Sequence, residues 1–225
     1  MTEFTTWRSL VDGAEIRAIP DAEVYLHDDW GDNKLQDRDD SGTTTHNGVE
    51  GVYRPEWGQV DGRDLPSVDD EKLVKQSEEA LQTDVNINLD ETVTWEFNGV
   101  DLTDAGEDGD NSRVAYWHLF SETLDLSADD LKQSYLIRIS GDINVELEEV
   151  DSNGDTTAII TGKELDTEIY DLKVERSPSG EWEIFVDDES QGTATDTSHT
   201  DPQYVAITNQ GGEFGTQRYD ELKIF

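Results

Sequence analysis

The stretch INVELEEVDSNGDT, residues 143–156, decides the fold class of this 225-residue chain. From Ile143 to Glu148 apolar and polar residues alternate, as they do in a strand with one buried and one outward face. The turn-forming pair Asn153-Gly154 follows, and a second strand-like run begins at Thr156. An Asn-Gly pair between two such runs is a strong signal of a β-hairpin. The stretch therefore predicts an antiparallel β-protein.

The strand-like pattern extends over much of the chain. It recurs at residues 93–98, 135–139, 169–176, 182–187, 204–208 and 218–225. The one helical candidate is short, from Leu126 to Gln133, with Ser127 placed to cap its first turn. A parallel sheet would require strands and helices to alternate regularly along the chain, and the sequence shows no such alternation. We therefore predict an all-β fold, an antiparallel two-sheet sandwich of the jelly-roll type.

The composition is strongly acidic, with 54 Asp and Glu against 16 Lys and Arg and a formal net charge of −38. This argues against nucleic-acid binding, which needs a basic surface to neutralise phosphates, and against anionic membrane surfaces. No apolar run approaches the roughly 20 residues that span a bilayer, so we expect no membrane insertion. The acidity resembles that of proteins from extreme halophiles, in which molar salt screens carboxylate repulsion.

Residues 1–22 differ from the rest and are predicted to form an attachment arm, with residues 23–225 as the domain. The apolar residues of the arm lie in a segment too short to bury them alone. They are Phe4, Trp7, Leu10, Val11, Ile16 and Ile19. The alternative is that the segment packs as a first strand against its own domain. The start of the chain lacks the basic and apolar blocks of a signal peptide, which favours folding inside a cell.

The last third of the chain resembles a known fold family. Residues 180–188 read GEWEIFVDD, residues 191–197 read QGTATDT and residues 219–225 read YDELKIF. They resemble the closing strands of the concanavalin A-like and laminin-G-like jelly roll, with Asp188 where that family usually has glycine. Segments 26–30 and 51–57 look like domains found in haloarchaeal genomes and their tailed viruses, and segments 6–13 and 18–21 look like the starts of such viral structural proteins. The resemblance implies a jelly-roll domain in such a virion protein.

Two groups of residues are candidates for carbohydrate binding, which needs aromatic faces for sugar rings and polar groups for hydroxyls. They are Tyr53, Arg54 and Trp57 in an expected loop, and Tyr116, Trp117 and His118 in succession on one strand. Because the second group places aromatic rings on both faces of its strand, we expect one of these faces to be exposed. Trp95 and Trp182 fit core positions better.

A structural Ca²⁺ is implied at one place. In the family that this chain resembles, calcium often links an early acidic loop to the last strand, and the matching positions are Asp28 or Asp29 with Asp220. Asp oxygens suit this hard cation. Catalysis is not expected, because neither H-E-x-x-H nor G-x-S-x-G occurs and the acid pairs do not match a glycoside hydrolase motif. We therefore predict no catalytic residue.

These features predict a non-enzymatic virion structural or adhesion protein of a haloarchaeal tailed virus, as a tail fibre, spike or capsid turret. The arm is expected to dock into the particle, which assembles in the host cytoplasm. The subunit is expected to form a homo-oligomer, to contact other virion proteins and to face host-surface glycans. The alternative is a cellular halophilic carbohydrate-binding module. A hydrolase of the same fold is a third hypothesis.

Overall fold

A computed structural model of the protein describes residues 26–28, 44–46, 49–52, 58–59, 66–69, 72–75, 81–102, 115–122, 133–139, 144–164, 169–208 and 217–225. In this part of the chain the regular elements are all strands, which confirms the all-β prediction. The predicted arm and most of the predicted helix lie outside it. Gln133, the last residue of that helix, stands directly before a strand with a φ of 56° and is not helical. No helix in the described ranges is long and apolar enough to cross a membrane.

The strands are β1 (Leu26–Asp28), β2 (Thr44–His46), β3 (Val49–Val52), β4 (Gly58–Gln59), β5 (Ser67–Asp69), β6 (Lys72–Lys75), β7 (Leu81–Asp84), β8 (Val93–Asp101) and β9 (Ala115–Ser121). They continue with β10 (Ser134–Ile139), β11 (Asn144–Val150), β12 (Thr156–Glu164), β13 (Ile169–Arg176), β14 (Glu181–Val186), β15 (Glu189–Thr195), β16 (Tyr204–Thr208), β17 (Gln217–Tyr219) and β18 (Glu221–Ile224).

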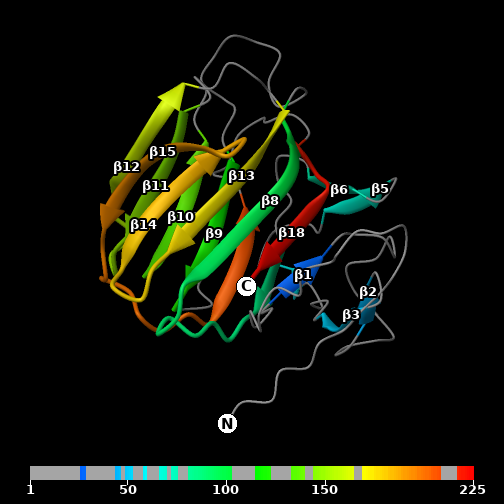
Figure 1. Ribbon diagram of the computed structural model, residues 1–225, viewed down its shortest axis with the longest axis horizontal. Coiled ribbons are helices and arrows are strands. Elements are labelled where there is room, and N and C mark those ends of the chain that lie inside the picture. Colours follow the sequence, from blue (N-terminus) through cyan, green and yellow to red (C-terminus); the bar gives the residue numbers. More distant parts are fainter. Residues whose placement is uncertain are drawn as a thin grey trace, which may run out of the picture.

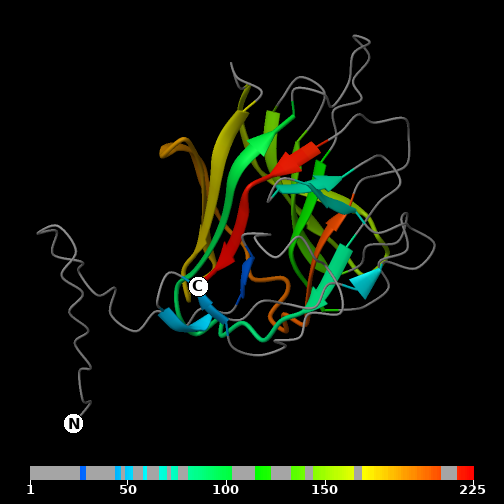
Figure 2. The same cartoon turned by 90° about the vertical axis from the view of Figure 1, so that its right-hand side faces the viewer.

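Two antiparallel sheets pack face to face (Figures 1 and 2). The nine-stranded sheet has the order β15-β14-β13-β8-β17-β6-β5, with β18 also beside β8 and β1 beside β18. The seven-stranded sheet has the order β12-β11-β10-β9-β16-β7-β4. Strands β2 and β3 form a small sheet of their own. This arrangement confirms the predicted two-sheet sandwich of the jelly-roll type.

The hairpin predicted from residues 143–156 joins β11 to β12. Its turn is closed by the Asp151 carboxylate, which accepts hydrogen bonds from the backbone N–H of Asn153 at 2.7 Å and of Asp155 at 3.0 Å. Gly154 has a φ of 88°, a conformation that glycine adopts at little cost. The local turn chemistry therefore matches the structure closely.

The hairpin between β14 and β15 turns at Asp187 and Asp188, whose φ values are 48° and 64°. Glycine is the usual residue in this left-handed region, but aspartate also enters it because its short polar side chain can hydrogen-bond locally. The Asp187 carboxylate accepts a hydrogen bond from the backbone N–H of Asp171 at 2.9 Å. Asp188 in place of glycine therefore does not prevent the turn.

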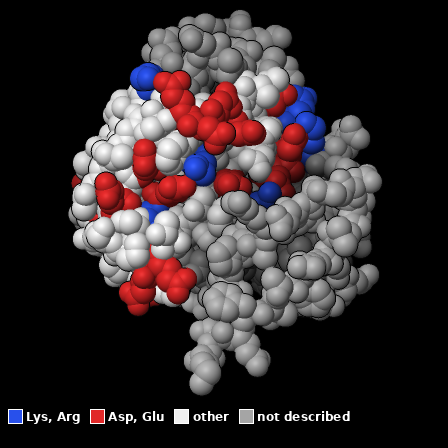
Figure 3. Space-filling view, in the orientation of Figure 1, with Lys and Arg blue, Asp and Glu red and all other residues white. Residues whose placement is uncertain are grey.

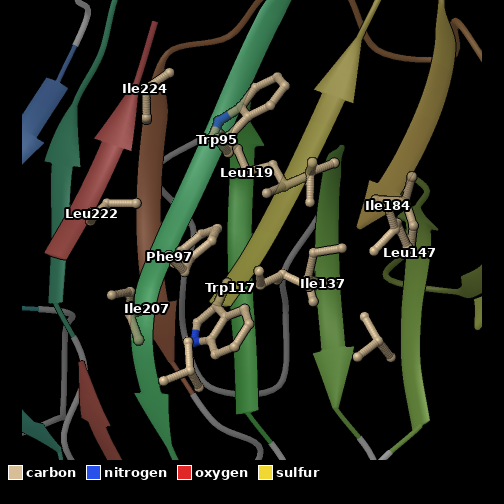
Figure 4. Packing of buried hydrophobic residues seen from close by; sticks show 14 of the residues in the cluster. Trp95, Phe97, Trp117, Leu119, Ile137, Leu147, Ile184, Ile207, Leu222 and Ile224 are labelled. Atoms are coloured by element: carbon tan, nitrogen blue, oxygen red, sulfur yellow. The ribbon is translucent and has the colours of Figure 1, made fainter. Parts of the chain in front are cut away.

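The core between the sheets is rich in aromatic rings (Figure 4). Trp95 of β8 and Trp182 of β14 are fully buried and stack with ring centroids 5.7 Å apart, which confirms their predicted core positions. Trp182 also lies 4.6 Å from the ring of Tyr135 on the facing sheet. Such large side chains bury much apolar area each, so this cluster contributes strongly to holding the two sheets together.

Candidate functional site

Trp117 was expected to be a carbohydrate-binding residue, but the structure places it in the core. It is fully buried on β9, and its ring stacks on Phe97 of the facing sheet with centroids 4.7 Å apart. Its Nε1 donates a hydrogen bond to the Tyr219 hydroxyl at 3.0 Å. The prediction for Trp117 is wrong, because the nine-stranded sheet covers this face of β9. The other predicted group, Tyr53, Arg54 and Trp57, lies outside the described residues.

Tyr116 and His118 lie on the opposite face of β9, which we call the outer face of the seven-stranded sheet. Tyr116 is 8% exposed and His118 is 0% exposed. Tyr116 forms a small apolar cluster with Leu136 of β10 and Val150 of β11, separate from the main core. We expected one face of β9 to expose an aromatic ring. This expectation is wrong, because Trp117 is buried on one face and Tyr116 is buried on the other.

Arg138 of β10 is a partly accessible residue of the outer face. Strand pairing places Arg138 between Tyr116 of β9 and Glu146 of β11. Its Nη1 lies 3.2 Å from Glu148 Oε1 and 3.5 Å from Glu146 Oε2. The Arg138 side chain is 37% exposed, against 19% for Glu146 and 6% for Glu148. We call Tyr116, Arg138, Glu146 and Glu148 the Arg138 cluster.

The electrostatics of the Arg138 cluster follow from partial burial. Burial raises the pKa of the Glu148 carboxyl above its usual value, while the Arg138 charge opposes this rise and Glu146 adds to it. Burial likewise raises the pKa of the Tyr116 hydroxyl, which therefore stays neutral. The cluster combines a partly exposed guanidinium and the Glu146 carboxylate with a buried hydroxyl and the buried Glu148 carboxylate. This mixture of donors and acceptors suits a ligand rich in hydroxyl groups.

His118 continues the polar set toward the middle of the sheet. Its Nε2 lies 3.1 Å from Oγ1 of Thr208 on β16, and burial lowers its pKa to about 3, so the ring is neutral. Within the described residues His118 Nδ1, Ser134 Oγ and Arg138 Nε are buried and have no hydrogen-bond partner. Buried polar atoms nearly always have a partner, so these three stand out within the described part of the chain, and none of them is open to solvent.

Sequence reasoning missed Arg138, Glu146, Glu148 and Thr208 as members of one site. The alternation along each strand does place Arg138 and Glu146 opposite the buried apolar residues. The neighbouring positions of β11, β10, β9 and β16 in the sheet follow from tertiary pairing. Thr208 in particular is 70 residues from Arg138 along the chain. The alternation of apolar and polar residues was the available signal. It shows which residues of one strand share a face, but it does not show which strands lie side by side.

Two of the three residues predicted to bind calcium, Asp28 and Asp220, lie within the residues that the structure describes. Strand β1 pairs with β18, and the backbone of Asp28 lies opposite Leu222, two residues after Asp220. The pairing brings the beginning and end of the domain together, as the resemblance implied. Asp220 forms an ion pair with Lys72, with Oδ1 and Nζ 2.5 Å apart. Among the described residues no group of three potential ligands stands in metal-binding geometry. Asp29 lies outside them, and calcium binding stays a prediction.

The outer face of the nine-stranded sheet is acidic, with a few Lys or Arg residues among the carboxylates (Figure 3). A hollow of about 120 Å³ on this face is lined by Glu96, Asn98, Asp171, Leu172, Lys173, Asp187 and Asp188. Two of these carboxylates already serve the fold: Asp171 accepts a hydrogen bond from the Gly99 N–H at 2.8 Å, and Asp187 accepts one from the Asp171 N–H. The hollow is therefore a weaker candidate than the Arg138 cluster.

No protein-family model and no curated protein matches the sequence. Solved structures of similar fold do match. The carbohydrate-binding module CBM66 from Bacillus subtilis is 16% identical, with a TM-score of 0.53 over 75% of this chain and 94% of that one. The carbohydrate recognition domain of Emp47p is 9% identical, with a TM-score of 0.54 over 84% of this chain and 98% of that one.

A third structure of similar fold is the ligand-binding domain of botulinum neurotoxin serotype D in complex with N-acetylneuraminic acid. It is 14% identical, with a TM-score of 0.51 over 82% of this chain. The chain spans about half of that domain, 47% of its length. At such identities the likeness shows the fold alone. The likeness therefore agrees with the antiparallel two-sheet jelly-roll sandwich described above.

Proposed function

We propose that the protein is a non-catalytic glycan-binding module and that the Arg138 cluster is part of its binding site. The observation that carries the proposal is a partly exposed guanidinium held between two carboxylates and a tyrosine. Two proteins of similar fold, CBM66 and the Emp47p domain, are a carbohydrate-binding module and a carbohydrate recognition domain, which supports the same class of ligand.

Polar side chains fix sugars by hydrogen bonds to ring hydroxyls, and a planar guanidinium can engage two of them at once. Arg138 is pre-oriented by Glu146 and Glu148, so little side-chain entropy is lost when a ligand is bound. The Tyr116 hydroxyl adds a neutral group beside it. The cluster thus combines donors, acceptors and partial exposure in one small area.

Arg138→Gln is expected to weaken glycan binding at least tenfold, because it removes the charged donors and leaves two carboxylates without their partner. Binding to an immobilised glycan panel is measured by surface plasmon resonance, and the unfolding transition is recorded in the same buffer. Lys173→Gln is the matched control, since Lys173 also pairs with a glutamate across 3.0 Å but lies on the other sheet. Equal losses in both variants would contradict this site.

The finer part of the proposal is that the module belongs to a virion of a haloarchaeal tailed virus and works at the host surface as a tail fibre, spike or turret subunit. Its support is sequence resemblance and the acidic composition, with a net charge of −38. The proposed attachment arm, residues 1–22, lies outside the described residues. A cellular carbohydrate-binding module is the alternative, and glycan binding by an isolated monomer favours it.

Deletion of residues 1–22 is expected to convert a homo-oligomer into a monomer, because the apolar residues of the arm are expected to be buried against other subunits. Light scattering in about 2–3 M salt, where carboxylate repulsion is screened, measures the mass of both forms. A full-length chain that is already monomeric contradicts the arm as an assembly device. It leaves the glycan-binding proposal intact.

A further inference from the structure

We infer that the Arg138 cluster selects uncharged, hydroxyl-bearing sugars over anionic ones, such as uronates, sialylated glycans or sulfated glycans. The inference rests on the proposed glycan-binding function and names its ligand class. The fold does not decide this question, because one structure of similar fold is a complex with N-acetylneuraminic acid, an acidic sugar. The preference for neutral or anionic sugars therefore depends on the charges at the site.

The guanidinium of Arg138 is already compensated. Two carboxylates contact its Nη1, at 3.2 Å from Glu148 and 3.5 Å from Glu146. An incoming carboxylate or sulfate would therefore compete with these two groups for the same donors and would meet like charges at close range. Proteins that recognise anionic groups instead present an arginine fork that is free to bind them in bidentate fashion.

The neighbouring described groups on the outer face add no positive charge. His118 is neutral because burial lowers its pKa to about 3, and it pairs with the Thr208 hydroxyl. Lys163, at the edge of the same sheet, is bound to Glu189 at 3.0 Å. Two carboxylates against one guanidinium leave the cluster itself with an excess of acceptors.

Sugar hydroxyls match this excess, because each hydroxyl both donates and accepts. A hydroxyl can donate to Glu146 while it accepts from Arg138, which an anionic oxygen cannot do. A neutral polyol therefore fits the site without disturbing its ion pairs.

The test uses the full chain and matched pairs of immobilised glycans, in which one member carries an anionic group that the other lacks. Suitable pairs are dextran and dextran sulfate, methyl-esterified and free polygalacturonate, and asialo- and sialylated N-glycans. All are measured at one fixed ionic strength, because glycan charge effects depend on salt. We expect binding to uncharged members and at least tenfold weaker binding to the anionic partner of each pair.

The net charge of the whole protein also repels anionic glycans, so the site must be separated from the general field. The double variant Glu146→Gln/Glu148→Gln releases Arg138 and is expected to shift the ratio of anionic to neutral binding at least tenfold toward the anionic member. The matched control Glu175→Gln/Glu183→Gln makes the same change in net charge on the other sheet and is expected to shift it far less. If the cluster double variant does not fold, the single variant Glu146→Gln takes its place, and Glu183→Gln becomes the matched control.

The outcomes separate the two proposals. A wild-type protein that prefers the anionic members overturns this inference and leaves glycan binding in place. Equal shifts in the cluster variant and its control also overturn it, since the general field then explains the preference. Absence of binding to every member of the panel refutes the proposed function, and this inference with it.

Discussion

Trp182→Ala is expected to lower the free energy of unfolding by about 4 kcal/mol, which lies within the range for large aromatic residues removed from a packed core. Trp182 is fully buried and contacts rings from both sheets, with centroids 5.7 Å from Trp95 and 4.6 Å from Tyr135. Its Nε1 also donates a hydrogen bond to the Asp196 carbonyl at 3.1 Å. Denaturant unfolding at fixed salt, followed by tryptophan fluorescence and circular dichroism, measures the change.

Phe185→Ala is the control for Trp182→Ala. Phe185 lies three residues further along the same strand but on its outward face, where the Lys173 ammonium sits 4.1 Å from the ring centroid. The loss there is expected to be about 1 kcal/mol or less, because the site is partly exposed and no cavity forms. If the two substitutions lower the free energy of unfolding by similar amounts, the core position of Trp182 is wrong.

Acidification is expected to destabilise the protein through His118. Burial lowers the pKa of His118 from 6.5 to about 3, so the native state stays unprotonated there while the unfolded chain takes up a proton below 6.5. Unfolding therefore binds a proton over this window, and the contribution of His118 to stability is present above pH 6.5 and is lost as the pH falls toward 3. The loss approaches roughly 5 kcal/mol, at about 1.4 kcal/mol per pH unit over this window.

The contribution of His118 is isolated by comparing wild type with His118→Gln from pH 7 to about pH 3.5, since the contributions of the many carboxylates are common to both proteins. Glutamine retains an amide near the Thr208 hydroxyl but does not titrate. The gap between the two stability curves should narrow steadily on acidification. NMR of the His118 ring provides a second readout. Parallel curves, or a ring that becomes protonated near pH 6, would rule out a buried neutral histidine.

Much of the fold could be predicted from local patterns. The hairpin at residues 143–156 and the strand at residues 169–176 are present as expected, because a period of two and an Asn-Gly turn are properties of adjacent residues. Trp95 and Trp182 were correctly assigned to the core. Trp117 was not assigned to the core. It follows Tyr116 directly, so the two rings lie on opposite faces of the strand, and the sequence does not show which face the other sheet covers.

The candidate site was much less predictable. Tyr116 and His118 were singled out, but as an exposed aromatic face, whereas both are buried. Arg138 gains its role from Glu146 and Glu148, which reach it across a strand pair whose register depends on the whole sheet. A scan for motifs in a chain with 54 acidic residues cannot select these two glutamates.

The sequence by itself determined the all-β class, several strands and turns and the acidic surface, because alternation, turn chemistry and composition act over a few residues. The tertiary structure decided which faces of β9 are covered, which strands lie beside Arg138 and which carboxylates neutralise it. These depend on contacts between residues far apart in the chain, such as His118 and Thr208, 90 positions apart. Such contacts form only once strands distant in the sequence have paired in the correct order and register, whose loop-closure entropy is lost first.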